Sequence, residues 1–572
     1  MAVSGNLITR VYTDFRGVDF TGKDVSLNRS PDALNVWKNY RDLGKAIETR
    51  PSTALFKSFS NPVYGFFFYT VNTQQHLVVH SGTKLYDLRL PSSDVTQPTE
   101  IYSGLAPVKS TFFVYNNILY IKDNTKYVQF NGTTASDVVG YIPTTSISRT
   151  PTGGGAIYED VNMLSPFRKN EFVGDGTSTE YHLDAPVIDS VSEVRVNDEV
   201  LTYETDYTYN VSSGTVTFTA APSVPATDGQ SNVVITYQKE VSGYADRILK
   251  CSIVTTFDNR VFFSGNPTYP NVVWHSSLND PTYISDLDYY NEGLDLAAVK
   301  ALVPGNQALW VFKEPSQANT TVFYHEPSID SQYGKIYPST HSSISTGCIA
   351  TGINFNDDIV FFSPRGMEAI EGSVTGDKVL AHRSSLVDAK LLNETDYTSM
   401  TLAEWEGYLF VFTGNKVYLA DSRAMFNNQD HVEYEWFYWE LDKDVVSAVV
   451  HDNTLYIGLD NGIYRFTEMT NGIVARWTTP LDEYNYPQYQ KTTNKKGSEI
   501  NMYGDEITVS VNTSMISNDW QVINTYENVK GYVVCRIKRK KWKAIQLKFE
   551  SSKPFAISKA TLEAYVGSYV KR

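Results

Sequence analysis

Cysteine is the residue that this sequence has least of: 572 residues include three, Cys251, Cys348 and Cys535. They lie far apart, which supports neither a disulfide framework nor a zinc site. We expect all three to be small buried hydrophobic residues in a reducing compartment. No apolar run approaches the roughly 20 residues that a membrane-spanning helix needs, and the start lacks the features of a signal peptide. We therefore expect a protein without a membrane anchor, made in a cytoplasm.

Charged residues are few, and basic ones are outnumbered. They make up 20% of the chain, with a formal net charge of −15. Because general nucleic-acid binding rests on neutralising phosphates, this charge opposes it. The charge is compatible with an acidic surface past which DNA slides without sticking. The hydrophobic content of 41% excludes disorder and coiled coil.

Motifs for catalysis and for cofactor binding are also missing. The sequence has no Gly-x-Ser-x-Gly elbow and no phosphate-binding glycine loop that opens a helix. His76 and His80 bracket an expected strand, which does not favour a zinc site. The oxygen-rich stretch Asp286–Gly293 lacks EF-hand spacing, and we interpret it as a solvated turn. We predict no enzyme and no cofactor, while a carboxylate pair for glycoside hydrolysis stays open because its separation is a three-dimensional quantity.

What the chain does have is strand chemistry, with 39 Tyr and 28 Phe. One phrase recurs, in which polar turn residues precede four or five apolar residues. It occurs at Tyr115–Ile121, Phe257–Phe263, Asn356–Phe362 and His451–Ile457. Asn and Asp tolerate the left-handed turn conformation, so Asp258 and the pair Asp357 and Asp358 are interpreted as turn residues. The run that follows suits a strand buried on both faces.

Seven apolar segments mark the expected central strands of this repeat: His76–His80, Ile118–Ile121, Val261–Ser264, Leu309–Lys313, Ile359–Ser363, Leu409–Thr413 and Leu455–Leu459. A hairpin repeated at this spacing is typical of a radially arranged β fold. We predict an all-β chain: an irregular β-propeller of six or seven blades, an inserted small β-sandwich domain and a C-terminal β-sandwich or platform.

The domain boundaries follow from where the repeat stops. The gap between the second and third central strands contains a Gly-rich stretch and then short alternating strands, too long for one blade. After about residue 480 a polar connector, 482–500, precedes renewed alternation. We predict an N-terminal arm that joins the platform (1–58, with a short strand near Ala46–Thr49), the propeller in two parts (59–150 and 244–480), the inserted domain (151–243) and the C-terminal platform (481–572).

The most unusual charge feature of this acidic chain is a basic run, formed by Arg536, Lys538, Arg539, Lys540, Lys541, Trp542 and Lys543. One interpretation is a solvated edge strand that lysines guard against aggregation. The other is a docking patch for an acidic partner, or a DNA-facing stripe on which Trp542 stacks with bases. Within the second interpretation we favour a protein partner. Both remain open from the sequence.

The two ends of the chain resemble a known family. Ser30–Asn35 followed by Gly44–Pro51 is similar to the start of nozzle-type proteins of short-tailed bacteriophages, and the strands from Lys541 through Ala564–Gly567 are similar to their closing strands. This is the tail nozzle, or packaged-DNA stabilisation, family, also described as tail tubular protein B-like. The opening of the inserted domain, Gly174-Asp175-Gly176-Thr177 followed by Leu183, is similar to small β domains of phage virion proteins.

The resemblance implies a structural virion protein. It would form the tail nozzle ring below the portal and head–tail adaptor proteins, retain packaged DNA and provide the channel for genome ejection. The implied partners are copies of itself in a ring expected to be hexameric, the portal and adaptor, tail fibre or tail spike proteins, and double-stranded DNA that passes without specific binding. The implied location is the virion tail, after synthesis in the bacterial cytoplasm. Asn35, Arg50 and Pro51 are the candidate contacts of the N-terminal arm.

Two other functions stay open. The supply of aromatic and carboxylate side chains suits a carbohydrate-binding or glycan-degrading propeller that recognises a receptor. The inserted domain at residues 165–240 suits a host-receptor adhesin.

Overall fold

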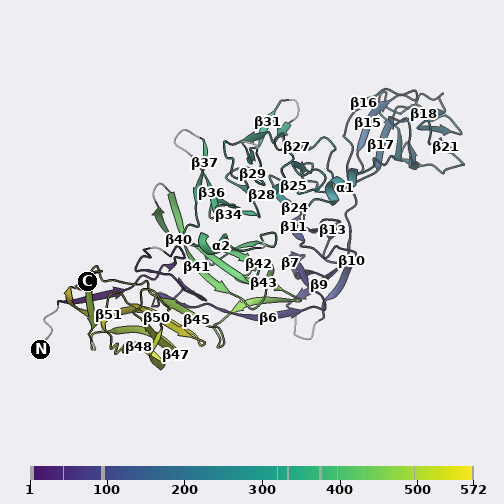
Figure 1. Cartoon of the computed structure of the whole chain (residues 1–572). Coiled ribbons are helices and arrows are strands. Elements are labelled where there is room, and N and C mark those ends of the chain that lie inside the picture. Colours follow the sequence, from purple (N-terminus) through teal and green to yellow (C-terminus); the bar gives the residue numbers. More distant parts are fainter. Residues whose placement is uncertain are drawn as a thin grey trace. The chain divides into compact units, whose positions relative to one another are not determined.

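The computed structural model describes residues 6–22, 24–42, 44–91, 97–317, 320–331, 334–372, 377–395, 397–428, 431–494 and 496–569. Within these ranges the regular structure is strand apart from two short helices, α1 (Tyr244–Leu249) and α2 (Asp388–Leu391) (Figure 1). The chain divides into two compact units, 1–66 with 343–572 and 67–342.

Seven four-stranded sheets occur within the described ranges. Four of them lie between residues 63 and 341. The first has β7 (Val63–Val71), β8 (Gln74–Ser81), β9 (Lys84–Leu90) and β10 (Thr99–Ser103), and the second has β11 (Thr111–Tyr115), β12 (Ile118–Lys122), β13 (Tyr127–Phe130) and β14 (Ala135–Asp137). The third has β24 (Ile253–Phe257), β25 (Arg260–Ser264), β26 (Val272–His275) and β27 (Tyr289–Asn291), and the fourth has β28 (Val299–Gly305), β29 (Ala308–Lys313), β30 (Val322–His325) and β33 (Ser339–His341). A hairpin, β31 (Ser328–Asp330) and β32 (Gly334–Ile336), interrupts the last of these.

The other three sheets belong to the unit that contains the C-terminus: β34 (Gly352–Phe355), β35 (Asp358–Ser363), β36 (Gly366–Gly372) and β37 (Lys378–His382); β38 (Thr401–Trp405), β39 (Tyr408–Thr413), β40 (Lys416–Asn428) and β41 (His431–Glu440); β42 (Val445–His451), β43 (Thr454–Leu459), β44 (Gly462–Thr467) and β6 (Ser52–Ser58). The predicted central strands fall in β8, β12, β25, β29, β35, β39 and β43, each the second strand of its sheet. The fold prediction, an all-β irregular propeller, is confirmed.

The hairpin turns adopt the backbone conformation that their residues predict. Asn116 and Asn117 have φ angles of 48° and 59°, and Asp452 and Asn453 have 45° and 58°. Two left-handed residues in succession match the right-handed twist of the flanking strands. Asp358 differs from the prediction, because it is not a turn residue but the first residue of β35.

The last propeller sheet is completed by a strand from the other end of the sequence. β6 pairs antiparallel with β44, from Ser58 opposite Gly462 to Ser52 opposite Thr467. The predicted arm, 1–58, is therefore wrong in its final residues: 52–58 belong to the propeller. The physical reason is that β44 needs a partner for the backbone groups on its outer edge.

The inserted domain is built from two sheets around a core of its own. One has six strands, in the order β16 (Ala156–Ile157), β15 (Thr144–Arg149), β17 (Phe167–Phe172), β23 (Val233–Gln238), β19 (Ser190–Val196) and β20 (Glu199–Val200), and the other has β18 (Glu180–His182), β22 (Thr215–Phe218) and β21 (Tyr207–Asn210). Phe172, Tyr181 and Ile235 are fully buried between them. The domain begins at Thr144, ahead of the predicted boundary at 151, because β15 pairs in parallel with β17.

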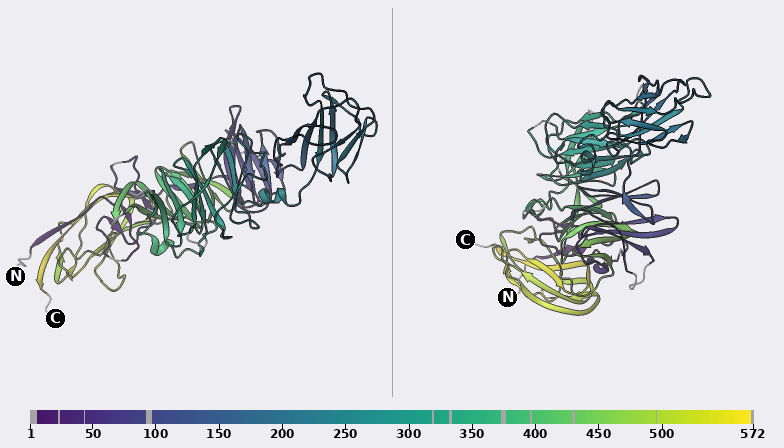
Figure 2. Two further views of the ribbon diagram at one scale, coloured as in Figure 1. Left: turned by 90° about the horizontal axis from the view of Figure 1, so that it is seen from above. Right: turned by 90° about the vertical axis from the view of Figure 1, so that its right-hand side faces the viewer.

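The C-terminal strands form one ten-stranded sheet with parts of the N-terminal arm. Its members are β1 (Leu7–Tyr12), β4 (Val36–Trp37), β5 (Ile47–Thr49), β45 (Ala475–Thr478), β46 (Tyr489–Thr493), β47 (Glu499–Asn512), β48 (Gln521–Val534), β49 (Lys540–Trp542), β50 (Gln546–Ser551) and β51 (Phe555–Tyr569). In Figure 1 and in the left view of Figure 2 the purple β1 leads from the N-terminus beside the yellow-green C-terminal strands, and it pairs with β51. We call this sheet the platform sheet.

The platform sheet corrects two predicted boundaries. β45 belongs to it, although residues up to 480 were assigned to the propeller, and the predicted connector 482–500 contains β46. The C-terminal strands are all connected by pairing into this one sheet, in which β47 pairs with β51 along its first part and with β50 along its last. The predicted arm strand near Ala46–Thr49 is confirmed as β5.

Close packing holds the arm against the propeller sheets of the same unit. β2 (Gly17–Val18) pairs in parallel with β3 (Arg29–Ser30) and contacts β41. A Cβ atom on Gly17 would lie 2.1 Å from the Trp436 carbonyl oxygen. Only glycine lets the two backbones approach this closely.

Candidate functional site

The basic run begins just after β48 and continues through β49. β49 pairs with β46 alone within the described ranges, so it is an edge strand of the platform sheet. Lys540 and Lys541 on β49 are exposed, as are Arg536, Lys538 and Lys543. Cys535 and Ile537 between them are fully buried. The cationic side chains therefore face solvent while the apolar ones enter the core, as expected for an edge strand guarded by lysines.

Trp542 does not face solvent, and its predicted role in stacking with bases is wrong. The side chain is 3% exposed. Its ring meets Tyr484 edge to face, with centroids 5.4 Å apart, and the Lys491 ammonium lies 5.4 Å from its centroid. A tryptophan held in this way packs the edge of the sheet and offers no free aromatic face. The candidate docking surface therefore consists of the exposed arginine and lysine side chains of the basic run.

The predicted arm contacts form a buried hydrogen-bonded cluster within the chain, made by Asn35, Arg50 and Pro51. The Asn35 side chain donates to the Val474 carbonyl (2.9 Å) and accepts from Arg50 Nε (3.0 Å) and from the Glu440 N–H (2.9 Å). The Arg50 guanidinium also donates to the carbonyls of Pro51 and Glu440, each at 3.0 Å. This cluster attaches the arm to β41 and to the segment before β45.

Arg50 is held by neutral acceptors rather than by a carboxylate. It is 5% exposed, and its printed side-chain partners are carbonyl and amide oxygens. Burial lowers the pKa of Arg50 to about 10. A buried charge satisfied by fixed dipoles is costly to lose, because its acceptors lose their donor with it. These residues are internal contacts of the arm in the described structure.

The histidines and acidic stretch considered from the sequence have structural partners. His76 Nδ1 lies 2.9 Å from Asp87, and His80 Nδ1 lies 2.6 Å from Ser110 Oγ. Burial lowers the pKa of His80 to about 4. Asp286–Gly293, interpreted as a solvated turn, contains strand β27 and the fully buried Glu292, which pairs with His325 at 2.8 Å. That interpretation is wrong because the stretch completes a propeller sheet.

One cluster has the residue types of a hydrolase triad but the wrong connections. His382 Nε2 lies 2.6 Å from Asp388, and its Nδ1 lies 3.4 Å from Glu368. The Ser384 hydroxyl donates to Asp388 at 2.6 Å rather than to the histidine. Burial disfavours the charged imidazole, but the hydrogen bonds to the two carboxylates outweigh it and raise the pKa of His382 to about 10. A protonated histidine cannot serve as the base for a serine nucleophile.

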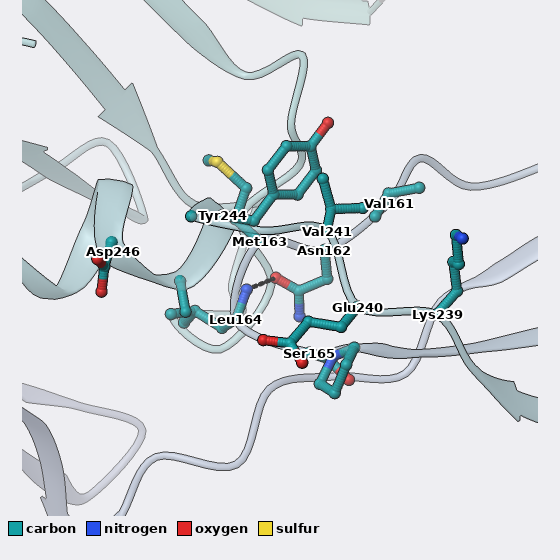
Figure 3. A pocket seen from close by; sticks show the side chains of 13 residues that line it. Val161, Asn162, Met163, Leu164, Ser165, Lys239, Glu240, Val241, Tyr244 and Asp246 are labelled. Carbon is teal, nitrogen blue, oxygen red and sulfur yellow. Dashed lines mark hydrogen bonds between the residues drawn. The ribbon is translucent and has the colours of Figure 1, made fainter. Parts of the chain in front are cut away.

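A pocket of about 350 Å³ lies where the inserted domain joins the rest of unit 67–342 (Figure 3). Its walls are the two connecting segments, 161–166 and 239–246. Asn162 fixes the first segment by donating to the carbonyls of Tyr141 (2.8 Å) and Thr282 (2.9 Å). Its side-chain oxygen accepts the N–H two residues ahead, the dashed line in Figure 3. The pocket is thus formed by the joint of the inserted domain.

A second pocket, of about 540 Å³, lies between the arm and the propeller sheets of the C-terminal unit. Trp37, Trp405 and Phe466 line it, with Glu48 and Glu406. The rings of Trp37 and Trp405 are stacked at 5.9 Å, and those of Trp405 and Phe466 at 5.6 Å. Sequence reasoning missed this pocket because its walls come from β4, β38 and β44, which share no local pattern.

Neither a metal centre nor a membrane segment is found in the described part of the chain. No group of three or more His, Cys, Asp or Glu side chains there is arranged to hold a metal ion. Among the same residues no helix has the length and apolar character needed to cross a membrane.

No protein-family model matches the sequence, and no curated protein matches it. Solved structures with distant likeness include the computationally designed Ika8 protein, 9% identical, which covers 72% of this chain and 98% of its own with a TM-score of 0.30. BamB from Moraxella catarrhalis is 10% identical, with 72% and 97% covered and a TM-score of 0.32. The Neurospora crassa Pan2 WD40 domain is 8% identical, with 73% and 94% covered and a TM-score of 0.26. Likeness this distant assigns no function.

Proposed function

We propose that this chain is a structural protein of a short-tailed bacteriophage tail, a nozzle ring below the portal and adaptor that retains packaged DNA and conducts it at ejection. The proposal rests on the resemblance of the two chain ends to the tail nozzle family. It assigns the chain no catalytic step and no cofactor.

The observation that carries the proposal is that the two ends bearing the resemblance fold together. β5 lies in the Gly44–Pro51 phrase and pairs antiparallel with β51, with Ile47 opposite Ile557. β1 pairs with the same strand, from Leu7 opposite Tyr565 to Tyr12 opposite Ala560. The family implies a platform made jointly by the N- and C-terminal segments, and the platform sheet has this composition.

Charge and chemistry are in keeping with this function. The net charge of −15 gives DNA little to bind, and like charge reduces sticking over a Debye length of roughly 8–10 Å. The candidate arm residues Asn35 and Arg50, and the histidines His76 and His325, are engaged in internal contacts. A wall of sheets whose candidate functional side chains are used in internal packing suits a conduit better than a catalyst.

Assembly and location test the proposal. Purified protein, alone and with the adaptor of the same virus, is examined by mass photometry and negative-stain electron microscopy. Ring-shaped oligomers are expected, as is the chain in purified mature particles by mass spectrometry. A protein that stays monomeric under both conditions and is absent from mature particles would overturn the proposal.

The aromatic pocket favours one alternative, a carbohydrate-binding or glycan-degrading propeller. Its stacked rings and two carboxylates are side chains that sugar sites use. The counter-argument is that Trp405 lies between Trp37 and Phe466, so both of its faces are occupied by packing. We therefore place this function second.

A glycan array with a hydrolysis screen tests the alternative. Glu406→Gln should abolish binding if the pocket holds a sugar, because Glu406 lines it. Glu404→Gln is the matched control, since Glu404 is an exposed residue of β38, two residues before Glu406 and outside the pocket. No binding by the wild-type protein, or equal binding by both variants, would exclude the pocket as the site.

A further inference from the structure

The platform sheet has one long edge without the usual protection. β48 has 14 residues and pairs with β47 alone among the described strands. Its inward side chains, among them Val529 and Ile523, pack against the core. Its outward side chains include Val522, Tyr532 and Val534, which are 65%, 67% and 51% exposed.

The contrast with β49, an edge strand of the same sheet, shows how unusual β48 is. β49 presents Lys540 and Lys541 over three residues. Over its 14 residues β48 carries two charged side chains, Glu527 and Lys530, and no proline. Proteins guard free edges with charge, proline or shortness, and a long apolar edge is a site for pairing with another strand. β48 is long, and its exposed apolar side chains invite a partner.

A matching edge lies on the opposite side of the same sheet. β1 pairs with β51 alone among the described strands, so the order β48, β47, β51, β1 has a free edge at each end. Exposed side chains alternate along β1 at Leu7, Thr9 and Val11, of which Leu7 is 49% and Val11 43% exposed. Ile8 and Tyr12 point the other way, into the core.

Val11 on one edge and Val534 on the other lie on one face of the sheet. Val11 is opposite Thr561, Thr561 is opposite Glu499, and Glu499 is opposite Val534. Directly paired residues on neighbouring strands point to the same side. Val11 and Val534 therefore begin and end a single row across four strands.

We propose that β48 of one copy pairs antiparallel with β1 of the next copy, so that the platform sheet continues from subunit to subunit. The direction is correct, because the four strands alternate and a second copy in the same orientation brings β1 antiparallel to β48. The face is correct as well, because the apolar rows of both edges meet on one side. A head-to-tail contact of this kind uses two different surfaces and closes into a ring where the rotation permits.

This inference deepens the proposed function, on which it rests, by naming the contact between subunits. The occupant of the β48 edge is a second copy of this chain. An edge strand from the adaptor is the competing occupant, and the experiment separates the two.

Disulfide trapping tests the contact in the full-length protein. Four double variants combine Leu7→Cys or Val11→Cys with Tyr532→Cys or Val534→Cys, which samples neighbouring registers on the same face. Within one chain Val11 and Val534 are three strand spacings apart, roughly 14 Å, too far for a disulfide. Any bond is therefore intermolecular. The three native cysteines are buried, and the wild-type protein gives the background.

At least one double variant is expected to give a ladder of covalent oligomers on a non-reducing gel, at least tenfold above its single variants. Val11→Cys with Lys540→Cys is the control on the guarded edge and should stay at background. If Tyr532→Cys or Val534→Cys alone gives dimers, two β48 edges pair with each other and the proposal is wrong. If only the adaptor is trapped, it is wrong as well.

A second variant keeps the result independent of disulfide chemistry. Tyr532→Lys with Val534→Lys guards the β48 edge with the charges that β49 carries, and both positions are exposed enough for the fold to tolerate lysine. Ile157→Lys with Val224→Lys, at exposed positions of the inserted domain, is the matched control. The edge variant is expected to shift rings to monomers by at least tenfold in apparent affinity, and the control to leave them intact.

The outcomes separate the two proposals. A monomeric wild-type protein contradicts the nozzle ring itself and this contact with it. Wild-type rings that persist in the edge variant and give no trapped ladder contradict the contact and leave the ring proposal standing.

Discussion

Replacing Asn35 is the most direct test of the buried hydrogen-bonded cluster that Asn35 forms with Arg50 and Pro51. Its side chain makes three hydrogen bonds, to the Val474 carbonyl, to Arg50 Nε and to the Glu440 N–H, at 2.9–3.0 Å. It is 6% exposed and has a left-handed backbone with φ of 55°. Asn35→Ala leaves three buried partners unsatisfied, at about 1–3 kcal/mol each, and adds about 1 kcal/mol for an alanine in this conformation. These contributions sum to about 4–10 kcal/mol, and because Arg50 keeps its bonds to the carbonyls of Pro51 and Glu440 we expect a cost in the lower part of that range, roughly 4–6 kcal/mol.

Two further variants divide that cost into its parts. Asn35→Gly loses the same hydrogen bonds but accepts the left-handed backbone, so it should cost about 1 kcal/mol less than Asn35→Ala. Asn35→Asp keeps the acceptor for Arg50 and Glu440 and loses only the donor to Val474. Because its negative charge also faces the buried guanidinium, we expect a cost of about 1–2 kcal/mol.

The measurement has to be local, because a chain of two compact units does not unfold in one step. Hydrogen exchange of peptides that cover residues 29–58 reports the opening of the arm directly. At about 1.4 kcal/mol per factor of ten, Asn35→Ala should speed this exchange by about a thousandfold and Asn35→Asp by about tenfold. Exchange that rises by less than tenfold in Asn35→Ala, or equally in all three variants, would refute the reasoning.

Three further predictions concern other parts of the molecule. Because the folded pKa of His382 is raised to about 10, the stabilisation by its ion pair is full below pH 6.5 and is lost between pH 6.5 and 10. The difference in unfolding free energy between wild type and His382→Gln, on the order of 3 kcal/mol at pH 7, should therefore shrink across that window. A difference that does not change with pH contradicts the ion pair. If charge on β49 guards its edge, changing both of its lysines to glutamate should keep the protein soluble, whereas changing both to valine should cause aggregation. Loss of adaptor binding by the glutamate variant alone would instead favour the interpretation as a docking patch. Replacing residues 167–238 by two glycines should leave ring assembly intact, because Lys239 N–H already bonds to the Pro166 carbonyl at 2.8 Å; adsorption of particles to host cells then decides whether the inserted domain is an adhesin.

The sequence predicted those parts of the fold that depend on neighbouring residues. A hairpin turn such as Asp452–Asn453 is specified by two residues that accept positive φ, and the strand after it by an apolar run. Seven central strands and the inserted domain could therefore be located. Pairing between distant segments has no such local signal. Nothing in Ser52–Ser58 indicates that its partner is β44, more than 400 residues away, because only the unpaired edge of β44 specifies the pairing.

The candidate site shows the same limit at the level of side chains. The basic run was correctly located at an edge strand, yet a tryptophan between lysines suggested an exposed ring. Its burial depends on Tyr484 and Lys491, which approach it from β46 and the turn before it. Arg50 was identified as a contact of the arm, but two of its three printed acceptors are main-chain carbonyls, which any residue type provides. Such acceptors leave no trace in a sequence.

β51 is the strand that makes one platform out of two chain ends. It pairs with β1 and β5 from the arm and with β46 and β47 from the C-terminal segment. Because β1 and β47 lie on opposite sides of it, the two free edges, β1 and β48, stand at opposite ends of one sheet only when β51 is in place. Under the proposed assembly, a chain that lacks β51 has no continuous sheet between the two contact edges. Under the same proposal, β51 therefore decides whether a copy is competent to assemble with its neighbours.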